Sequence, residues 1–219
     1  MTRVLIPELV LRDPEAGADR LGRLFGFRPE GDRMVLGSQS VILSAGEPDG
    51  RHGRIDHIAL SVPDLGAALR ECVGRGAHIS DATPEGPVHI AEFWEGGVDY
   101  VFLDGPEGAK MELLARRPPA PRAAWGHEHI GLSCAEFAPM RDWLLGLGFI
   151  EQSRVTLHRP GGDVEASFLA WGDDVVELYC LPETRANPTL NAGRGFWRLR
   201  AEGLDGPQTG PEGVEILPL

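Results

Sequence analysis

The sequence has few cysteines and no excess of positive charge, and both absences limit what the protein can be. Its three cysteines, Cys72, Cys134 and Cys180, are isolated from one another and form no C-x-x-C motif. This pattern argues against a disulfide framework, so we expect a reducing compartment, the cytoplasm. The net charge of −12 argues against partners that bind through bulk positive charge, namely nucleic acids and anionic membrane surfaces.

Long apolar runs and several common catalytic motifs are also missing. No run approaches the roughly 18–20 apolar residues that a membrane span needs, and the N-terminus shows no signal-peptide pattern. The sequence contains neither G-x-S-x-G nor a glycine-rich phosphate loop after a strand. With 219 residues, 42% of them hydrophobic, the chain can still bury a full core as one large domain or two small ones.

What the sequence does contain is a repeat. The segment 55–65, IDHIALSVPDL, reads as a strand with His57 and Ser61 on one face and only apolar residues on the other. Seventy-two residues later the segment 127–134, HEHIGLSC, repeats the pattern, with His129 in the place of His57. Glu8 takes that place in an earlier strand, Val4–Leu11. A periodic unit of this kind determines the fold class.

A helix with a capped start and a glycine stop is expected after each of these strands. We expect the helices to start at Asp13-Pro14, at Asp64 and at Pro139, and to stop at Gly26, Gly76 and Gly148. The intervals from strand position to stop glycine are 18, 19 and 19 residues. Three nearly equal intervals indicate three copies of one unit.

Hairpins close the second and third copies. Tyr100–Leu103 and Lys110–Leu114 flank one turn, and Ala166–Ala170 and Val175–Tyr179 flank another. Each copy therefore reads as strand, helix and three strands. The predicted organisation is repeat one at 1–46, repeat two at 54–116, repeat three at 125–182 and a truncated repeat four at 195–219. The proline-containing stretches Gly46–Gly53, Arg116–Ala124 and Pro182–Gly195 are expected to be connections.

Two glutamates interrupt the apolar closing strands. Glu112 lies between Met111 and Leu113, and Glu177 occupies the matching place in repeat three. Because burying an unpaired carboxylate costs several kcal/mol, each glutamate either faces solvent at an edge or has a partner in a cavity. Two histidines and two carboxylates that converge would suit a divalent cation with open coordination positions.

This pattern resembles the vicinal oxygen chelate superfamily, which includes glyoxalase I, methylmalonyl-CoA epimerase, extradiol dioxygenases and bleomycin resistance proteins. The resemblance covers residues 3–181 and implies an α+β fold in which βαβββ units pair into a cup-shaped mixed sheet. It implies a cation (Ni, Co, Zn, Mn or Fe) bound by His57, Glu112, His129 and Glu177. Repeats one and four offer instead Glu8 with Ile42 and Arg198 with Glu215.

The pairing of the repeats decides how many complete ligand sets there are. Pairing repeat two with repeat three gives one complete set, which is the arrangement we expect. Pairing one with two and three with four gives two incomplete sets and remains the alternative. Units of the superfamily also pair between chains, so a homodimer is a further alternative.

The resemblance implies three alternative functions. The first is glyoxalase- or epimerase-type lyase or isomerase chemistry on a small carbonyl substrate, through a metal-bound enediolate, with Glu112 or Glu177 as the base. The second is Fe(II)-dependent extradiol cleavage, and the third is small-molecule binding without chemistry. Ser61 and Ser133, which share the histidine faces, and Tyr100 are the expected substrate contacts.

Overall fold

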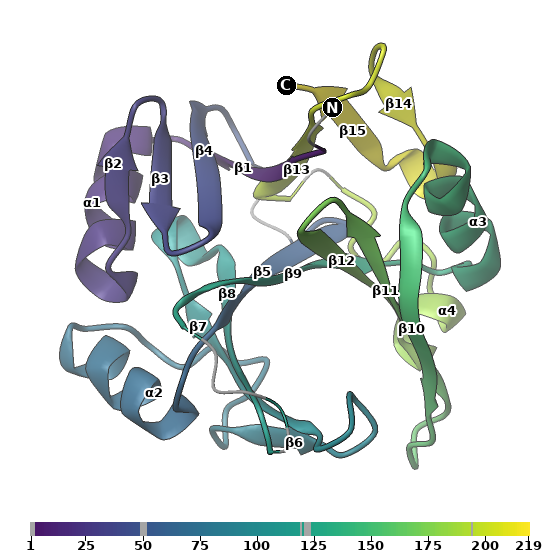
Figure 1. The fold of residues 1–219 in the computed structure, drawn as a ribbon, viewed down its shortest axis with the longest axis horizontal. Coiled ribbons are helices and arrows are strands. Elements are labelled where there is room, and N and C mark those ends of the chain that lie inside the picture. Colours follow the sequence, from purple (N-terminus) through teal and green to yellow (C-terminus); the bar gives the residue numbers. More distant parts are fainter. Residues whose placement is uncertain (1–2, 49–51, 119, 121–123, 194) are drawn as a thin grey trace. The chain divides into compact units, whose positions relative to one another are not determined.

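The structure is a computed structural model that describes residues 3–48, 52–118, 120, 124–193 and 195–219. Within these residues the strands form two curled mixed sheets, of seven and eight strands (Figure 1). The chain divides into two compact bodies. The N-terminal body comprises Leu9–Glu47 and His57–Glu128, and the C-terminal body comprises Met1–Glu8, Pro48–Asp56 and His129–Leu219. Among the described residues, no helix combines the length and the apolar character that crossing a bilayer requires.

Repeats one and two have the same strand order, first–fourth–third–second. Repeat one consists of β1 (Leu5–Leu11), α1 (Pro14–Phe25), β2 (Arg28–Glu30), β3 (Arg33–Leu36) and β4 (Gln39–Ala45), with its strands ordered β1-β4-β3-β2. Repeat two consists of β5 (Ile55–Ser61), α2 (Leu65–Gly74), β6 (Val88–Ile90), β7 (Val98–Asp104) and β8 (Lys110–Arg116), ordered β5-β8-β7-β6. The shared order confirms the predicted βαβββ unit.

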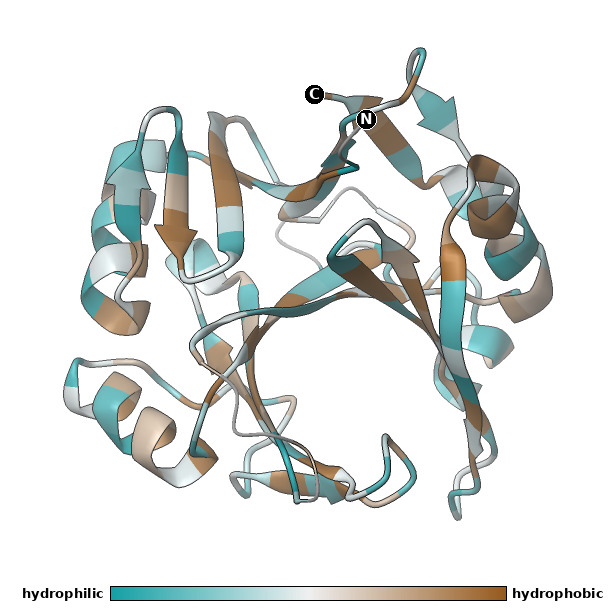
Figure 2. Ribbon diagram, viewed as in Figure 1, coloured by the Kyte–Doolittle hydropathy of each residue, from teal (hydrophilic) through white to brown (hydrophobic). Residues whose placement is uncertain are grey.

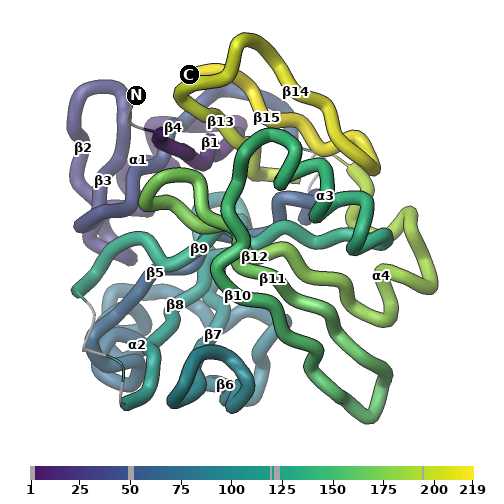
Figure 3. Tube along the Cα trace, turned by 45° about the vertical axis from the view of Figure 1, so that its right-hand side comes forward, coloured from purple at the N-terminus to yellow at the C-terminus, as the bar shows by residue number. Residues whose placement is uncertain are grey.

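Repeat three follows the same plan, and repeat four is a shortened version. Repeat three consists of β9 (Gly126–Ser133), α3 (Phe137–Leu147), β10 (Ile150–Leu157), β11 (Val164–Trp171) and β12 (Asp174–Cys180). Figure 3 shows its long β10–β11 hairpin. Repeat four consists of β13 (Trp197–Ala201), β14 (Gln208–Thr209) and β15 (Glu215–Pro218). The short strand β14 was not expected, and neither was the helix α4 (Pro182–Ala186) in the preceding connection.

Two of the three predicted helix starts are confirmed. The Asp13 side chain accepts a hydrogen bond from the Ala16 amide, and Asp64 accepts one from the Ala67 amide, as N-cap residues do. The third start is wrong, because α3 begins at Phe137 and not at Pro139. Pro139 lies in the first turn, where backbone N–H groups have no partner within the helix, so the missing donor costs nothing.

The core of the repeats lies between the apolar faces of helices and strands. In α1 the buried side chains Leu21, Leu24 and Phe25 lie along one side, and in α3 Met140 and Leu144 do the same. Figure 2 shows hydrophilic and hydrophobic residues alternating along α1 and α2, which is typical of helices that cover a sheet with one face.

The register of the closing strands determines which residues share a face. β5 and β8 are parallel, with His57 opposite Lys110 and Ala59 opposite Glu112. β9 and β12 are parallel in the same way, with Gly131 opposite Glu177. Each glutamate therefore lies opposite the residue that follows the histidine by two positions. Because side chains alternate between the two faces of a strand, His57 and Glu112 lie on the same face of the sheet. His129 and Glu177 lie on the same face for the same reason.

The same register corrects the reading of repeat four. There Arg200 lies opposite Leu217, so Leu217, and not Glu215, occupies the position of Glu112. Glu215 corresponds to Lys110. The turns Gly105–Gly108 and Gly210–Gly213 have the same sequence, Gly-Pro-Glu-Gly, and counting from these turns gives the correct alignment.

Candidate metal centre

In the N-terminal body, His57 and Glu112 form a buried pair. The Nε2 atom of His57 lies 3.0 Å from Oε2 of Glu112, and the two side chains are only 3% and 5% exposed. Parallel pairing of β5 with β8 brings them together, because the crossover through α2 returns the chain to the same sheet. Ala59, directly opposite Glu112, is small enough to leave room for this contact.

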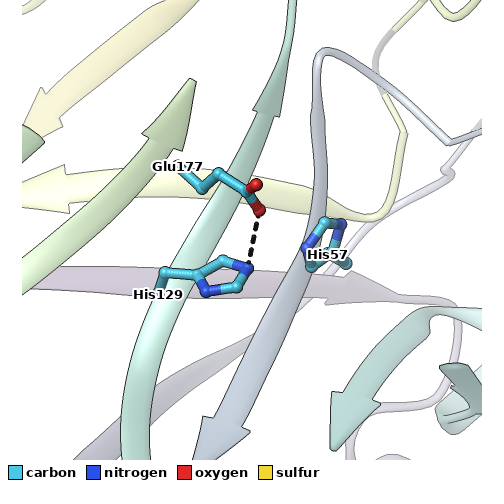
Figure 4. Close-up of side chains that lie close together, drawn as sticks. All are labelled: His57, His129 and Glu177. Carbon is cyan, nitrogen blue, oxygen red and sulfur yellow. Dashed lines mark ion pairs between the residues drawn. The ribbon is translucent and has the colours of Figure 1, made fainter. Parts of the chain in front are cut away.

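In the C-terminal body, His129 and Glu177 form the same pair. The Nε2 atom of His129 lies 3.0 Å from Oε2 of Glu177, and the side chains are 1% and 11% exposed. Figure 4 marks this contact with a dashed line. Gly131 takes the place of Ala59 opposite the glutamate. Repeats two and three thus share a histidine–glutamate pair as well as their strand order.

A phenylalanine accompanies each pair, and the sequence analysis did not identify either of them. Phe102 lies directly opposite Glu112 in the β7–β8 hairpin, and its ring is edge-on to His57 with 4.9 Å between centroids. Phe168 lies directly opposite Glu177, with its ring edge-on to His129 at 6.0 Å. The available signal was that each hairpin carries an aromatic residue at the position that pairs with the glutamate.

The geometry within each pair suits a shared cation. Two ligand atoms about 2.1 Å from a metal and at right angles to each other are about 3.0 Å apart. This is the separation of the nitrogen and oxygen atoms in both pairs. Imidazole nitrogen and carboxylate oxygen are ligands that Zn, Ni, Co, Mn and Fe accept. The residues present therefore fit a divalent cation, which would offset the cost of burying the carboxylates.

The position of repeat one that corresponds to His57 is occupied by an ion pair. The carboxylate of Glu8 lies 2.6 Å from Nε of Arg200 in β13, and Glu8 is nearly buried. This hydrogen bond raises the pKa of the Arg200 guanidinium. A carboxylate paired with arginine is a poorer metal ligand than one paired with histidine, because the charge of arginine competes with the cation.

The three expected substrate contacts differ in their surroundings. The Ser61 hydroxyl donates a hydrogen bond to the Ala124 carbonyl at 2.9 Å. The Ser133 hydroxyl is buried and has no hydrogen-bond partner among the described residues. Tyr100 is half-buried, with its ring 5.5 Å from that of Phe102.

Comparisons with known proteins give a match at the level of structure. No protein-family model and no curated protein sequence matches the chain. Two crystal structures of glyoxalase I variants from Zea mays match with a TM-score of 0.64. They are 14% and 13% identical in sequence and cover 98% of this chain, and 92% and 93% of theirs. A candidate dioxygenase from Bacillus subtilis matches with a TM-score of 0.56 and 13% identity, covering 95% of this chain and 82% of its own.

These matches extend over nearly the whole chain and confirm the predicted architecture. The chain has the fold of glyoxalase I and the vicinal oxygen chelate superfamily.

Proposed function

We propose that His57, His129 and Glu177 bind a single divalent cation beside Glu112, and that the protein is an enzyme of the glyoxalase or epimerase type. The observation that carries this proposal is that His57, His129 and Glu177 each offer a ligand atom, all within 4.8 Å of one another (Figure 4). Side chains this close, buried and of these types are a typical metal-binding group.

The roles of the two glutamates differ in this proposal. Glu177 belongs to the three-residue group and is assigned as a ligand, whereas Glu112 stands outside the group and is assigned as the base. Glu112 is held at 3.0 Å from His57, so its carboxylate adjoins the reacting centre. When bound, the cation would act as a Lewis acid toward two neighbouring oxygens of a carbonyl substrate.

The remaining side chains bind and orient the substrate. Glu112 takes the proton from the carbon next to the carbonyl and returns it to the neighbouring carbon on the same face of the substrate. The Ser133 hydroxyl, buried and without a partner among the described residues, donates to a substrate oxygen. The Phe102 and Phe168 rings contact the histidines edge-on and help to orient them.

A second candidate is an Fe(II)-dependent dioxygenase. One observation favours it: His57, His129 and Glu177 together are two histidines and one carboxylate, the ligand set of many non-haem Fe(II) oxygenases. Glu112 has no task in that chemistry. Elemental analysis of protein purified without added metal or chelator distinguishes the candidates, because O₂-sensitive Fe(II) favours the dioxygenase.

Proton exchange tests the proposed enzyme directly. In D₂O, the protein loaded with Zn²⁺ or Ni²⁺ should incorporate deuterium at the α-carbon of α-hydroxy-carbonyl compounds, beginning with hydroxyacetone, as followed by proton NMR. Glu112→Gln should retain the metal and lose the exchange, whereas Glu177→Gln should lose metal affinity. Full metal occupancy in His57→Ala would refute the proposed ligand set. Exchange that is unaffected in Glu112→Gln would refute the proposed base.

The cytoplasm remains our proposed location. The three cysteines are free thiols and all are buried. Burial raises the pKa of the Cys72 thiol to about 11, so at neutral pH it carries very little reactive thiolate.

A further inference from the structure

Two of the three buried thiols lie side by side in the C-terminal body. Cys134 directly follows β9, and Cys180 is the last residue of β12. The parallel register pairs Tyr179 with Ser133, so the next residue of each strand, a cysteine in both, lies opposite the other. The Cys134 amide extends the ladder by donating to the Tyr179 carbonyl at 2.9 Å. Neighbouring strands are about 4.8 Å apart, a separation of Cα atoms that a disulfide can span.

The side chains of the two cysteines meet between the strand ends. The Cys134 thiol donates to the Tyr179 carbonyl and the Cys180 thiol donates to the Ala135 carbonyl, both at 3.5 Å. Each thiol therefore reaches across to the backbone of the other segment. The two thiols are also hydrogen-bond partners of each other. Cysteines that meet in this way can be bridged without a large movement of the backbone.

The surroundings of Cys180 favour its thiolate. The hydrogen bond from Cys134 is the main cause, and it lowers the pKa of Cys180 from 9.0 to about 7 against the opposing effect of burial. Two charged groups lie nearby. Arg185 in α4 favours the thiolate, and Glu165, directly opposite Cys180 in β11, disfavours it. These two pair with each other at 3.3 Å, so the neighbouring thiol has more influence than either charge.

Cys134 has the opposite character. Its hydrogen bond to Cys180 and its burial both raise the pKa of Cys134. The charged groups near it, Glu212 and Arg54, pair with each other at 2.6 Å. Near neutral pH, Cys180 therefore ionises first and Cys134 keeps its proton. A thiolate beside a protonated thiol is typical of a redox-active cysteine pair.

The short helix α4 lies on the path to Cys180. It begins two residues after Cys180, and the Arg185 side chain contacts the thiol. α4 has only five residues and no side-chain hydrogen bond at its N-cap. Because a helix this short is unstable by itself, we expect it to open more readily than the strands. Opening gives a small oxidant access to Cys180 while β9 and β12 remain paired.

We propose that Cys134 and Cys180 form a redox modification site, which hydroperoxides convert to a disulfide. The inference is independent of the proposed function. The bond would join the ends of the two strands that carry His129 and Glu177. A reversible disulfide is also compatible with a reducing compartment, where such bonds are transient and redox-sensing.

The reaction balances with hydrogen peroxide as the oxidant. The Cys180 sulfur attacks one peroxide oxygen, the O–O bond breaks, and Cys180 becomes a sulfenic acid while hydroxide leaves and takes up a proton. The Cys134 sulfur then attacks the sulfenic sulfur, the S–O bond breaks, and water leaves. The two thiols together lose two electrons and two protons, and the peroxide is reduced to two molecules of water.

Mass spectrometry of the metal-free wild-type protein tests the pairing. Reduced protein is treated with hydrogen peroxide, denatured and alkylated with N-ethylmaleimide. Arginines separate the three cysteines, so trypsin releases each in its own peptide. We expect a cross-linked peptide that contains Cys134 and Cys180 and that dithiothreitol splits. Cys72, a buried thiol whose pKa is raised to about 11, should remain free for alkylation and is the internal control.

Three outcomes of this experiment would overturn the proposal. The first is that all three thiols remain free, and the second is that Cys134 or Cys180 is oxidised without the cross-link. The third is a cross-link that forms only between chains, which a dimer on a non-reducing gel would reveal. None of them bears on the metal centre, because no cation is present.

Single substitutions by serine test the assigned roles. In Cys134→Ser, the sulfenic acid on Cys180 has no thiol to react with, so dimedone should label Cys180. In Cys180→Ser, dimedone should label Cys134 more than about tenfold more slowly, because its thiolate is scarce. Cys72→Ser is the matched control and should form the disulfide as the wild type does. Equal labelling rates in the first two variants would overturn the assignment of Cys180 as the attacking thiol. If either variant fails to fold, the wild-type experiment still decides the pairing.

Discussion

Each metal-binding histidine of the proposed centre is held by an aromatic ring as well as by a carboxylate. The glutamate contacts one ring nitrogen, whereas the edge-on phenylalanine restricts rotation of the imidazole about its side-chain bonds. A ligand that is already oriented loses less conformational entropy when the cation binds. In the proposed centre, Phe102 and Phe168 would therefore contribute to metal affinity without touching the metal.

We expect Phe102→Leu to weaken metal binding by roughly three- to tenfold, because an aromatic pair contributes about 0.5–1.5 kcal/mol beyond its buried area. Competition with a fluorescent chelator measures the affinity. Phe102→Tyr keeps the ring and is the control, with affinity close to wild type. A Phe102→Leu variant that binds the cation as tightly as wild type would show that the ring has no orienting role.

A second set of side chains, on the helix-facing side of β11, predicts a pH dependence of stability. Arg141 donates two hydrogen bonds of 2.6 Å to the carboxylate of Glu151, and Ser167 donates one of 2.7 Å. Chiefly through Arg141, these bonds lower the pKa of Glu151 from 4.5 to about 2. Because the pKa is lower in the folded state, the pairing stabilises the fold above pH 4.5, and this contribution is lost as the pH falls toward 2.

Glu151→Gln should therefore lower the free energy of unfolding by about 1–3 kcal/mol at pH 7 and by progressively less below about pH 4.5. Urea denaturation of both proteins between pH 7 and pH 3 measures the difference. Glu47→Gln, at an exposed ion pair with Arg12, should change the stability by less than about 0.5 kcal/mol throughout. A Glu151→Gln effect that stays constant down to pH 3 would contradict the assigned pKa.

Two turns of identical sequence precede the closing strands β8 and β15, and each contacts the start of a helix. In both Gly-Pro-Glu-Gly turns the glutamate has a left-handed backbone, with φ of 50° at Glu107 and 56° at Glu212, a conformation that costs about 1–3 kcal/mol. Glu107 accepts a hydrogen bond from the Asp13 amide before α1. Glu212 accepts from the Ala135 and Glu136 amides before α3. The strained turn thus places a carboxylate at the positive end of a helix, where it is stabilising.

The two turns should differ in their contribution to stability. Glu212 also pairs with Arg54 at 2.6 Å, and both side chains are nearly buried, at 12% and 5% exposed. We expect Glu212→Ala to cost about 3–5 kcal/mol, because the buried Arg54 guanidinium loses its counter-charge and keeps only hydrogen bonds to the Leu190 and Pro188 carbonyls. Glu107→Ala should cost about 1 kcal/mol, as the loss of a cap does. Urea denaturation of the two variants measures both. Equal losses would mean that the Arg54 pair contributes nothing beyond the cap.

The strands and turns also show what the sequence could and could not predict. Alternation and spacing were enough to predict the βαβββ repeats and the four candidate ligands, because both depend on local periodicity. The start of α3 was misplaced, since proline is tolerated anywhere in a first turn. Glu215 was matched with Glu112 because both are glutamates. The pairing of β13 with β15 instead puts Leu217, two residues later, at that position. Phe102 was missed because its contact with His57 depends on a cross-strand neighbour.

The proposed centre takes its residues from both compact bodies of the chain. The N-terminal body supplies His57 and Glu112, and the C-terminal body supplies His129 and Glu177. Two separate cations, one for each pair, would leave each ion with only two protein ligands. One cation bound by His57, His129 and Glu177 has three protein ligands, with positions left for substrate. The two arrangements differ in how metal binding in one body affects the other.

With one shared cation, metal should stabilise the chain as a single system. At 100 times its dissociation constant, Zn²⁺ should add about 2.7 kcal/mol, which raises the melting temperature of a chain this long by roughly 5–11 °C, and EDTA should reverse the shift. Hydrogen exchange measured by mass spectrometry should show metal-dependent protection of β12 as well as β8. His57→Ala should abolish this protection in β12, although it lies in the other body, whereas His158→Ala, at an exposed side chain paired with Asp163, should have no effect. Protection of β12 that survives in His57→Ala would show that each pair binds a cation of its own.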